Sequence, residues 1–457
     1  MSDELALLAA IRDNPDEDTP RLVYADWLDE QGGDANAARA EFIRVQCEYS
    51  RIDVGAGPDE AKRSKRLDAR AQRLCRGFSA QWVAGFPSGA VKYADFARGF
   101  RVSAKFAAAK FSATLAPPWY REPGLEIELS GSAPDVTRLF AKGQLDGVRE
   151  LEINPTRDAG ADAMLAALAA SGCAATLRKL GVWSASFTDL GLRALASGNL
   201  GQLREVSFMG RFSARGWADF FAKGASTQLE DVTIGHRGPW QTAAENQPGP
   251  ALAGVLATAP QMASVERLWL SDCGLTDVGL AEILACGWFD KLSRLHLGND
   301  VMGSATDEAL GTAKLPALTQ LLIGSCHLRD TGVETLANGS LMSQLEQLDV
   351  TLNELGPASA RAIAVCGRTH KLKELNFGCT EIGDEGVIAL MASPHFPTLT
   401  SLMLSSLSLT DRGADAVLNA KWLSQLKTLF LSYNSISPNK RAELVQRFGK
   451  VLWIAGT

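Results

Sequence analysis

The feature that most limits the fold of this chain is a short leucine-rich pattern that recurs at a nearly constant spacing. Seven copies, from VERLWLSDCGL to LKTLFLSYNSI, begin 26 or 27 residues apart. Their first residues are Val265, Leu292, Leu318, Leu345, Leu372, Leu399 and Leu426. A repeat of about 20 to 50 residues is typical of a solenoid, in which each copy forms one structural unit that stacks on its neighbours.

Weaker copies precede the seven regular ones and extend the array towards the N-terminus. LRKLGVWSASF begins at Leu177, LREVSFMGRF at Leu203 and LEDVTIGHRG at Leu229, and EPGLEIEL, VRELEI and ARGFRV continue the series backwards. Together they indicate about 13 units. The 36 residues from Leu229 to Val265 exceed one period, so we expect an insertion of about ten residues in GHRGPWQTAAENQPGP.

Each unit is predicted to contain one short strand followed by one helix. In the strand, leucines at alternate positions point into the core, and the side chains between them point to the opposite face. Runs such as LTDVGLAEIL and IGDEGVIALM predict the helix. An aspartate opens four of these runs and is expected to cap its helix. These aspartates are Asp277, Asp330, Asp384 and Asp411. Stacking such units predicts an α/β fold with a parallel sheet.

The pattern LxxLxLxx(N/C/T)xL resembles the leucine-rich repeat family, and the helical second halves are most similar to its ribonuclease-inhibitor-like, or cysteine-containing, type. This resemblance implies a right-handed solenoid shaped like a horseshoe, with the parallel sheet on its concave face. We expect the solenoid to span residues 91–436 and residues 437–457 to form a C-terminal cap.

The first 90 residues have no repeat and are predicted to form a small all-α module. Four helices are expected, over Asp3–Arg12, Pro20–Gln31, Ala35–Arg51 and Pro58–Phe78. The segments TPRLVYADWLDE and RAEFIRVQ resemble the repeat-companion domain of planctomycete proteins, and FARGF resembles the segment where such proteins enter their repeats. The family has no established biochemical activity, so this resemblance implies architecture. Because the end unit of a solenoid exposes apolar surface, we expect the module to act as a cap.

Two details of this module follow from helical spacing and charge. In TPRLVYADWLDE, Thr19 is expected to cap the helix, and Val23, Trp27 and Leu28 are expected on its buried face. The basic run KRSKR is expected to face the acidic helices beside it or solvent, and contact with nucleic acid is the alternative.

Composition disfavours several classes of protein. The net charge is −6, which is not typical of a nucleic-acid-binding protein. No apolar run approaches the roughly 20 residues of a membrane-spanning helix, and no secretory signal is recognisable. The eight cysteines form no CxxC pair and have no histidine cluster beside them, so we expect reduced thiols in a cytoplasmic protein and no metal site.

Catalytic motifs are missing from the sequence. HExxH, GxSxG, GxxxxGK(S/T) and a GxGxxG after a strand do not occur, and the five histidines are dispersed. We therefore expect a protein that is not an enzyme and that uses no cofactor.

A binding surface is expected on the sheet, where large aromatic side chains between the inward leucines would otherwise be exposed without reason. Its early part is acidic, with Glu126, Glu128, Glu150 and Glu152. The residues predicted to contact a partner are Trp183, Met209, Arg267, Trp269, His296, Leu322, Asp349, Met403, Phe430 and Tyr433. Two alternatives stay open: these side chains lean on one another, or the strand register slips by one residue in the weak repeats.

The sequence therefore predicts a monomeric, non-enzymatic scaffold that binds a protein partner on the concave face of its repeats, with no nucleic acid and no membrane involved. The alternative is a substrate-recognition or regulatory subunit that docks a separate effector through its N-terminal helical module.

Overall fold

The computed structural model describes most of the chain, namely residues 3–14, 16–52, 57–82, 96–101, 103–110, 124–155, 160–223, 228–236, 248–287 and 289–455. The chain divides into two compact units, Met1–Ser186 with Ser197–Leu203, and Phe187–Ala196 with Arg204–Thr457. Fourteen strands, β3 to β16, lie in parallel sheet in the order of the chain. The predicted α/β solenoid with an N-terminal helical region is confirmed. Among the described residues, no helix is long and apolar enough to cross a membrane.

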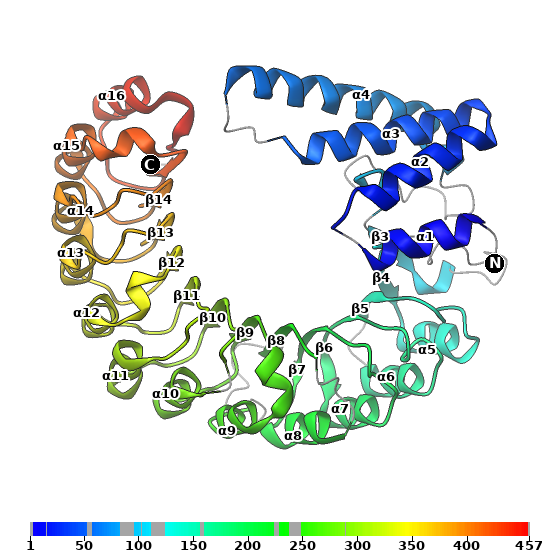
Figure 1. Ribbon diagram of the computed structural model, residues 1–457. Helices are drawn as coiled ribbons and strands as arrows, with labels where there is room; N and C mark the ends of the chain where they lie inside the picture. The colour runs from blue at the N-terminus through cyan, green and yellow to red at the C-terminus, as the bar shows by residue number, and fades with distance from the viewer. Residues whose placement is uncertain are drawn as a thin grey trace. The chain divides into compact units, whose positions relative to one another are not determined.

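The first unit opens with four helices (Figure 1). They are α1 (Asp3–Asp13), α2 (Thr19–Gln31), α3 (Asp34–Ser50) and α4 (Pro58–Trp82). Each predicted helix is present, and α4 continues four residues beyond its predicted end. Contacts with α3 stabilise this last turn. The ring centroid of Trp82 lies 5.0 Å from that of Phe42, and Trp82 Nε1 donates to the carbonyl oxygen of Ala35 at 3.0 Å.

The buried face of α2 differs from the predicted one. Val23 is 47% exposed, whereas Tyr24 and Leu28 are buried and Trp27 is partly buried. The ring of Tyr24 stacks on that of Trp27 with 5.6 Å between their centroids. Thr19 is the first helical residue and not the cap, since the residue before the helix is Asp18. The Val23 prediction is wrong because α1, α3 and the entry to the repeats, not helical spacing alone, decide which side is covered.

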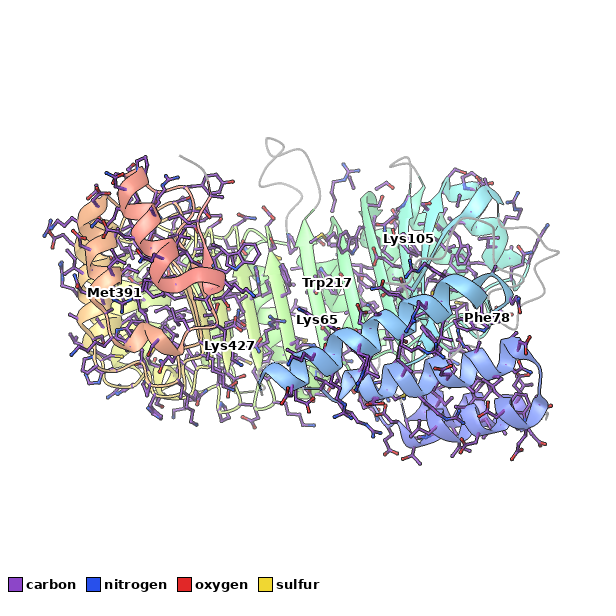
Figure 2. All side chains as sticks on the ribbon, turned by 90° about the horizontal axis from the view of Figure 1, so that it is seen from above. Lys65, Phe78, Lys105, Trp217, Met391 and Lys427 are labelled. Atoms are coloured by element: carbon purple, nitrogen blue, oxygen red, sulfur yellow. The ribbon has the colours of Figure 1, made fainter. Side chains whose placement is uncertain are left out.

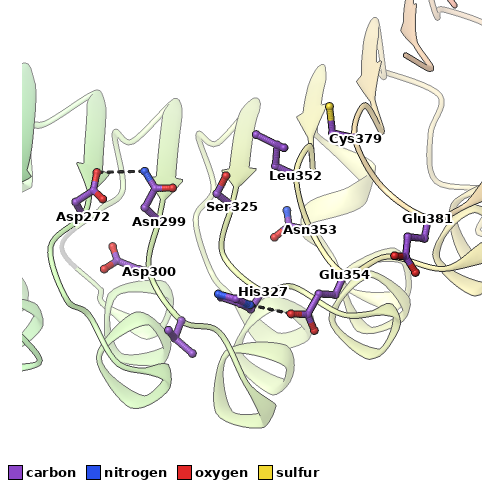
Figure 3. Close-up of a pocket in the computed structure, with 11 residues that line it drawn as sticks. Asp272, Asn299, Asp300, Ser325, His327, Leu352, Asn353, Glu354, Cys379 and Glu381 are labelled. Carbon is purple, nitrogen blue, oxygen red and sulfur yellow. Dashed lines mark hydrogen bonds and ion pairs between the residues drawn. The ribbon is translucent and has the colours of Figure 1, made fainter. Parts of the chain in front are cut away.

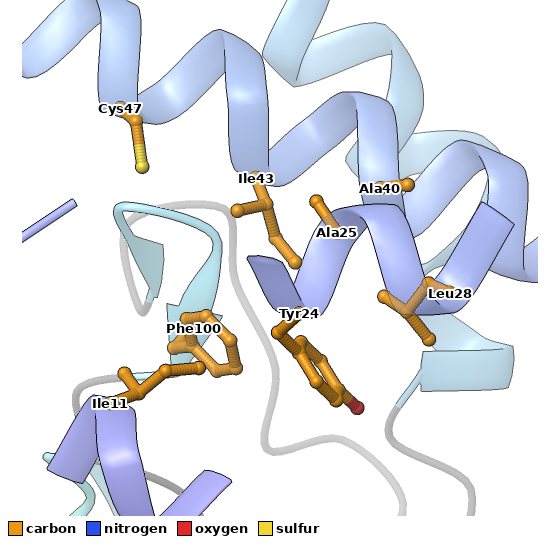
Figure 4. Packing of buried hydrophobic residues seen from close by; sticks show 8 residues of the cluster. All are labelled: Ile11, Tyr24, Ala25, Leu28, Ala40, Ile43, Cys47 and Phe100. Carbon is orange, nitrogen blue, oxygen red and sulfur yellow. The ribbon is translucent and has the colours of Figure 1, made fainter. Parts of the chain in front are cut away.

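A two-residue turn lies at the entry of the repeats. Strands β1 (Phe96–Ala97) and β2 (Phe100–Arg101) pair antiparallel around Arg98 and Gly99, whose φ angles are 47° and 87°. The backbone N–H of Gly99 donates to Gln46 Oε1 at 2.6 Å. Phe100 is buried against Ile43 and the ring of Tyr24 (Figure 4). The helical module and the entry segment therefore share one core.

The repeats of the first unit alternate strands and helices. They comprise β3 (Ser103–Ala107), β4 (Glu126–Gly131), α5 (Ala133–Ala141), β5 (Glu150–Pro155), α6 (Ala161–Ala169) and β6 (Lys179–Thr188), whose last two residues belong to the second unit. Glu126 pairs in register with Glu150, and Glu128 with Glu152. This register places the predicted acidic residues on one sheet face, opposite the buried Ile127 and Leu151.

The second unit begins with its weaker repeats, which are α7 (Asp189–Ala196), β7 (Glu205–Arg211), α8 (Ala214–Lys223), β8 (Asp231–His236) and α9 (Ala251–Thr258). An aromatic cluster fills the core here, where Trp217 of α8 is fully buried and packs edge-on against Phe212 and Phe220. Most of the predicted insertion, residues 237–247, lies outside the described residues.

The seven regular copies follow. Their strands are β9 (Arg267–Ser271), β10 (Arg294–Gly298), β11 (Gln320–Gly324), β12 (Gln347–Asp349), β13 (Glu374–Asn376), β14 (Ser401–Met403) and β15 (Thr428–Phe430), and β16 (Leu452–Trp453) closes the series. Their helices are α10 (Asp277–Ala285), α11 (Ser304–Thr312), α12 (Asp330–Asn338), α13 (Pro357–Val365), α14 (Gly383–Ala392), α15 (Asp411–Asn419) and α16 (Pro438–Phe448). Within this unit the strands line one side and the helices the other (Figure 1), so the buried Met391 of α14 lies in the helical layer (Figure 2).

The aspartates predicted to cap their own helices instead bind the next repeat. Asp277 accepts hydrogen bonds from the backbone N–H groups of Gly303, Ala305 and Thr306, at 2.8, 2.9 and 2.7 Å, and so caps α11. Its own helix is capped by Thr276. The later repeats do the same: Asp330 binds Gly356 and Ser359, Asp384 binds Thr410 and Gly413, and Asp411 binds Ser437. The prediction is corrected from a cap within one unit to a link between two.

The pKa of Asp277 reflects this link. Burial acts to raise the pKa, but the hydrogen bonds from Thr306, Ala305 and Gly303 outweigh it, so the pKa lies below its usual value. The carboxylate is therefore ionised at neutral pH, which suits a helix N-terminus.

We expect Asp277→Ala to lower the free energy of unfolding by roughly 2 kcal/mol or more, because three backbone donors lose their acceptor. The matched control is Glu282→Ala on the exposed face of the same helix, with a change within about 0.5 kcal/mol. Urea unfolding measures both. An equal, small effect of the two substitutions would show that the inter-repeat cap contributes nothing.

A second pair of variants tests the packing of the entry turn. A Cβ on Gly99 would lie 2.4 Å from Ile43 Cγ1, whereas a Cβ on Gly33, also at positive φ, would meet nothing within 4 Å. Gly33→Ala should therefore cost only the roughly 1–3 kcal/mol of placing an alanine in an extended backbone conformation with positive φ. Gly99→Ala should cost at least about 1 kcal/mol more, because it adds a steric clash. Calorimetric melting curves distinguish the two, and identical losses would contradict the packing of the turn on α3.

Candidate functional site

The sheet face of the second unit has the alternation that the sequence predicts. In β9, Leu268 and Leu270 are buried at 1% and 0% exposure, while Trp269 between them is 44% exposed. Leu295 and Leu297 of β10 are likewise fully buried. The backbone of the strand therefore fixes the indole of Trp269 outside the core.

Three of the predicted contact residues lie side by side. His296 of β10 is in register with Trp269 on one side and with Leu322 of β11 on the other. The imidazole of His296 stacks on the indole of Trp269, with ring centroids 3.9 Å apart and planes 11° from parallel. We call these three residues the aromatic strip. The alternative that these side chains lean on one another holds for this pair, yet much of Trp269 stays accessible to a partner.

The electrostatics of the strip favour an uncharged surface. Burial lowers the pKa of His296, and Arg294 acts in the same direction, whereas Asp349 opposes them. With its pKa below 6.5, His296 is mainly neutral at pH 7. The strip therefore presents an indole, a neutral imidazole and a leucine, without a formal charge.

Arg267 has a different role from a free contact residue. Its Nε donates to Asp231 Oδ2 at 2.8 Å, and its guanidinium lies 3.7 Å from Glu205. The hydrogen bond to Asp231 raises the pKa of Arg267. Arg267 thus links β9 to the acidic residues of β7 and β8, and it borders the strip as a paired ion.

The remaining predicted residues are spread over other strands. Trp183 in β6 is 38% exposed, which argues against a register slip there. Met209 lies half-buried in β7, Met403 half-buried in β14, and Asp349 of β12 accepts a hydrogen bond from Asn376 Nδ2 at 2.7 Å. None of these four side chains lies in the core, and none belongs to the aromatic strip.

A second aromatic group lies at the end of the array. Phe430 of β15 stacks on Trp453 of β16, with centroids 5.7 Å apart and planes 18° from parallel. Trp453, which is 57% exposed, is not among the residues predicted from the sequence, because it follows the last recognisable repeat. Tyr433 was predicted on the sheet, but it lies beyond the end of β15 with a φ of 57° and is 65% exposed.

Tyr433 belongs to a column that recurs in every regular copy, at the eighth position of the pattern. The residues of this column all have positive φ, between 55° and 57°, and are Asp272, Asn299, Ser325, Leu352, Cys379, Ser406 and Tyr433. Their N–H groups continue the ladder after the strands, for example from Leu352 to the Gly378 oxygen at 3.1 Å. The signal in the sequence is faint, because a side chain in the left-handed region is uncommon except for Asn, Asp and Gly.

A groove of about 770 Å³ follows this column across β9 to β13 (Figure 3). Asp272 Oδ2 accepts from Asn299 Nδ2 at 3.1 Å, and His327 Nδ1 lies 2.8 Å from Glu354 Oε1. The hydrogen bond with His327 lowers the pKa of Glu354. In the part of the chain that the structure describes, no group of three His, Cys, Asp or Glu side chains could hold a metal ion.

Some of the acidic and basic residues of the first unit form ion pairs with one another. In the first unit, Glu126 lies 3.0 Å from Lys179, and Glu128 pairs with Lys105 of β3 (Figure 2). Arg63 binds Glu48 at 2.8 Å, so part of the basic run faces the acidic helix α3 as expected.

Comparison with known proteins identifies the repeats. Residues 343–364 and 369–391 match the family model described as "Leucine Rich repeat", so these units are leucine-rich repeats. No curated protein is significantly similar in sequence. Among solved structures, an internalin from Listeria monocytogenes is 19% identical, covering 78% of this chain and 86% of that one with a TM-score of 0.42. The Rad7 and Elc1 complex of yeast is matched at 14% identity, covering 99% of this chain and 91% of that one with a TM-score of 0.44.

The strain at the eighth position yields a prediction for Leu352, whose φ is 56° and whose side chain is 55% exposed. Leu352→Asn should raise the free energy of unfolding by roughly 0.5–1 kcal/mol, because asparagine tolerates the left-handed region and little apolar contact is lost. Leu352→Val, with a branched Cβ, should lower it. The two Tm shifts should have opposite signs, and shifts of the same sign would refute the strain.

Proposed function

We propose that this protein is a non-enzymatic, protein-binding scaffold whose partner contacts the aromatic strip on the sheet face of the second unit, Trp269, His296 and Leu322. The observation that carries this proposal is the 44% exposure of Trp269 in the middle of a strand whose neighbouring leucines are fully packed. Tryptophan is the residue most enriched at the energetic centres of interfaces, so its exposure on a regular sheet points to a contact surface.

The rigidity of the strip supports a binding role. Trp269 is held by paired strands on both sides and by the stack with His296. A side chain that is already ordered loses little conformational entropy on binding, which otherwise costs about 0.5–1.5 kcal/mol for each side chain that becomes immobilised.

The surroundings of the strip fit an interface as well. Arg267 is paired with Asp231, and Asp349 accepts from both Asn376 Nδ2 and the N–H of Thr351. These polar groups keep their partners when water leaves the strip, so covering it leaves few unsatisfied groups. An apolar centre with a polar border is the usual arrangement of a protein interface.

The second aromatic group, Phe430 and Trp453, supports a large partner. Six strand spacings of about 4.8 Å separate β9 from β15, so a protein that touched both groups would span roughly 29 Å along the sheet. Such a span exceeds a small molecule and suits the face of a folded protein domain.

The chemistry of the described residues supports the remaining parts of the proposal. Burial raises the pKa of Cys47, Cys173 and Cys326 to about 12, so their thiols are protonated and poorly nucleophilic at neutral pH. All eight cysteines are free, which supports a reducing compartment such as the cytoplasm. The core that Phe100 shares with α2 and α3 supports a capping role for the N-terminal module. We further propose that the protein acts as a monomer without nucleic acid.

The test uses Trp269→Ala and a matched control, Val278→Ala, which removes a 60% exposed side chain from α10. A partner is identified by affinity capture and its Kd is then measured by titration. Trp269→Ala should raise the Kd at least about tenfold, since loss of a central anchor costs about 2 kcal/mol or more. Val278→Ala should leave the Kd unchanged.

Trp269→Ala loses the stack on His296, which should lower the free energy of unfolding by only roughly 0.5–1.5 kcal/mol. The Tm should therefore fall only slightly. An unchanged Kd for Trp269→Ala would rule out the aromatic strip as the contact surface, whatever the Tm does.

A further inference from the structure

The ninth position of the regular copies lies in the loops and is occupied by Cys273, Asp300, Cys326, Asn353, Thr380, Leu407 and Asn434. In two copies it holds an asparagine that is almost fully buried, Asn353 at 7% and Asn434 at 4% exposure. Asn353 Oδ1 accepts from the N–H groups of Cys326 and Leu328, at 2.9 and 3.1 Å. Its Nδ2 donates to the carbonyl oxygens of Ile323 and Val350, at 2.7 and 3.0 Å. One side chain thus links the loops of two adjacent repeats.

Asn434 repeats this arrangement at the same sequence offsets. Its Oδ1 accepts from Leu407 and Leu409 at 2.9 and 3.1 Å, and its Nδ2 donates to the carbonyl oxygens of Leu404 and Leu431 at 2.8 and 3.0 Å. In these two copies the side chain therefore acts as an acceptor through one atom and as a donor through the other.

Asp300 occupies the same position in the copy that contains β10. It is 1% exposed, and its Oδ1 accepts from the N–H of Leu275 at 2.9 Å, the bond that corresponds to Leu328 and Asn353. Its Oδ2 has no hydrogen-bond partner among the described residues. By the offsets of the asparagines, the carbonyls of Leu270 and Leu297 take the place of Ile323 and Val350. A carboxylate oxygen repels these carbonyls, whereas a protonated carboxyl donates to one of them.

We propose that Asp300 is a proton-operated link between the repeats of β9 and β10: its neutral carboxyl closes the junction, and its ionised form loosens it. The strands of the same two repeats carry the stack of Trp269 on His296, and Asp300 follows the end of β10 by two residues. The proposal concerns stability and does not depend on what the strip binds.

The environment of Asp300 places the transition near neutral pH. Burial raises its pKa to about 7, and the neighbouring Asp272 acts in the same direction, while the N–H groups of Leu275, Gly274 and Cys273 oppose this. The other titratable groups that face it are the thiols of Cys273 and Cys326, which burial keeps neutral.

The sign of the effect follows from linkage. The folded carboxyl holds its proton more tightly than the unfolded one, whose pKa is 3.8. The folded protein therefore loses stability as the pH rises from about 4 to about 7, and the loss is complete above that range.

Asp300→Asn supplies at every pH a donor like those of Asn353 and Asn434. It should raise the Tm by at least about 3 °C at pH 8 and leave it nearly unchanged at pH 5, relative to the wild type. Asn353→Asp is the reciprocal variant, which should be destabilised at pH 8 and close to wild type at pH 5. The titration of all other groups is common to the three proteins and cancels in these differences.

Amide hydrogen exchange locates the effect. At pH 8 the amides of residues 272–275 should exchange at least about tenfold faster in the wild type than in Asp300→Asn, and at the same rate at pH 5.5. The loop that contains Leu407 should show equal rates in both proteins at both pH values. A difference in Tm between wild type and Asp300→Asn that is the same at pH 5 and pH 8 would overturn the proposal, as would equal exchange of residues 272–275 at pH 8.

Discussion

Each repeat in this protein leaves polar groups that only the next repeat satisfies, and the rest of the structure depends on this exchange. Asp277 holds the first turn of α11, and Asn353 binds Cys326, Leu328 and Ile323 of the preceding repeat. A unit alone would expose both its apolar face and these groups. Stacking buries the apolar face and satisfies these polar groups at the same time. Because both effects need the same register between units, the spacing of the copies is nearly constant.

The same exchange prepares the sheet for binding. Because neighbouring strands pair residue by residue, the columns of side chains are held in register, and Trp269, His296 and Leu322 form a strip. The inward leucines provide the stability, and the outward residues are free to vary. Function in such an array can therefore change along the sheet without a change in the core.

Much of the fold could be predicted because leucine spacing encodes it within one unit. The strands, the four N-terminal helices and the exposure of Trp269 follow from periodicity alone. The contacts between units could not be predicted in this way. Asp277 looks like a cap for its own helix, and only the position of Gly303 in space shows that it caps the next one.

The other differences between the sequence-based predictions and the structure also arise from contacts that periodicity does not encode. Val23 of α2 is exposed because the neighbouring elements, which follow no period, cover Tyr24 instead. Trp453 lies after the last recognisable copy, so no template assigns it to the sheet. For the binding site, spacing predicts which side chains leave the core, whereas the stack of His296 on Trp269 and the pairing of Arg267 with Asp231 depend on rotamers.

Along the sheet, equivalent side chains of neighbouring strands are spaced about 4.8 Å apart. An extended peptide laid across the strands presents side chains on one face about every 6.7 Å, so it loses step with the columns after one or two contacts. A helix rises about 5.4 Å in each turn, which keeps step with Trp269, His296 and Leu322 over three strands. The period that builds the core thus also selects the shape of surface that can follow it.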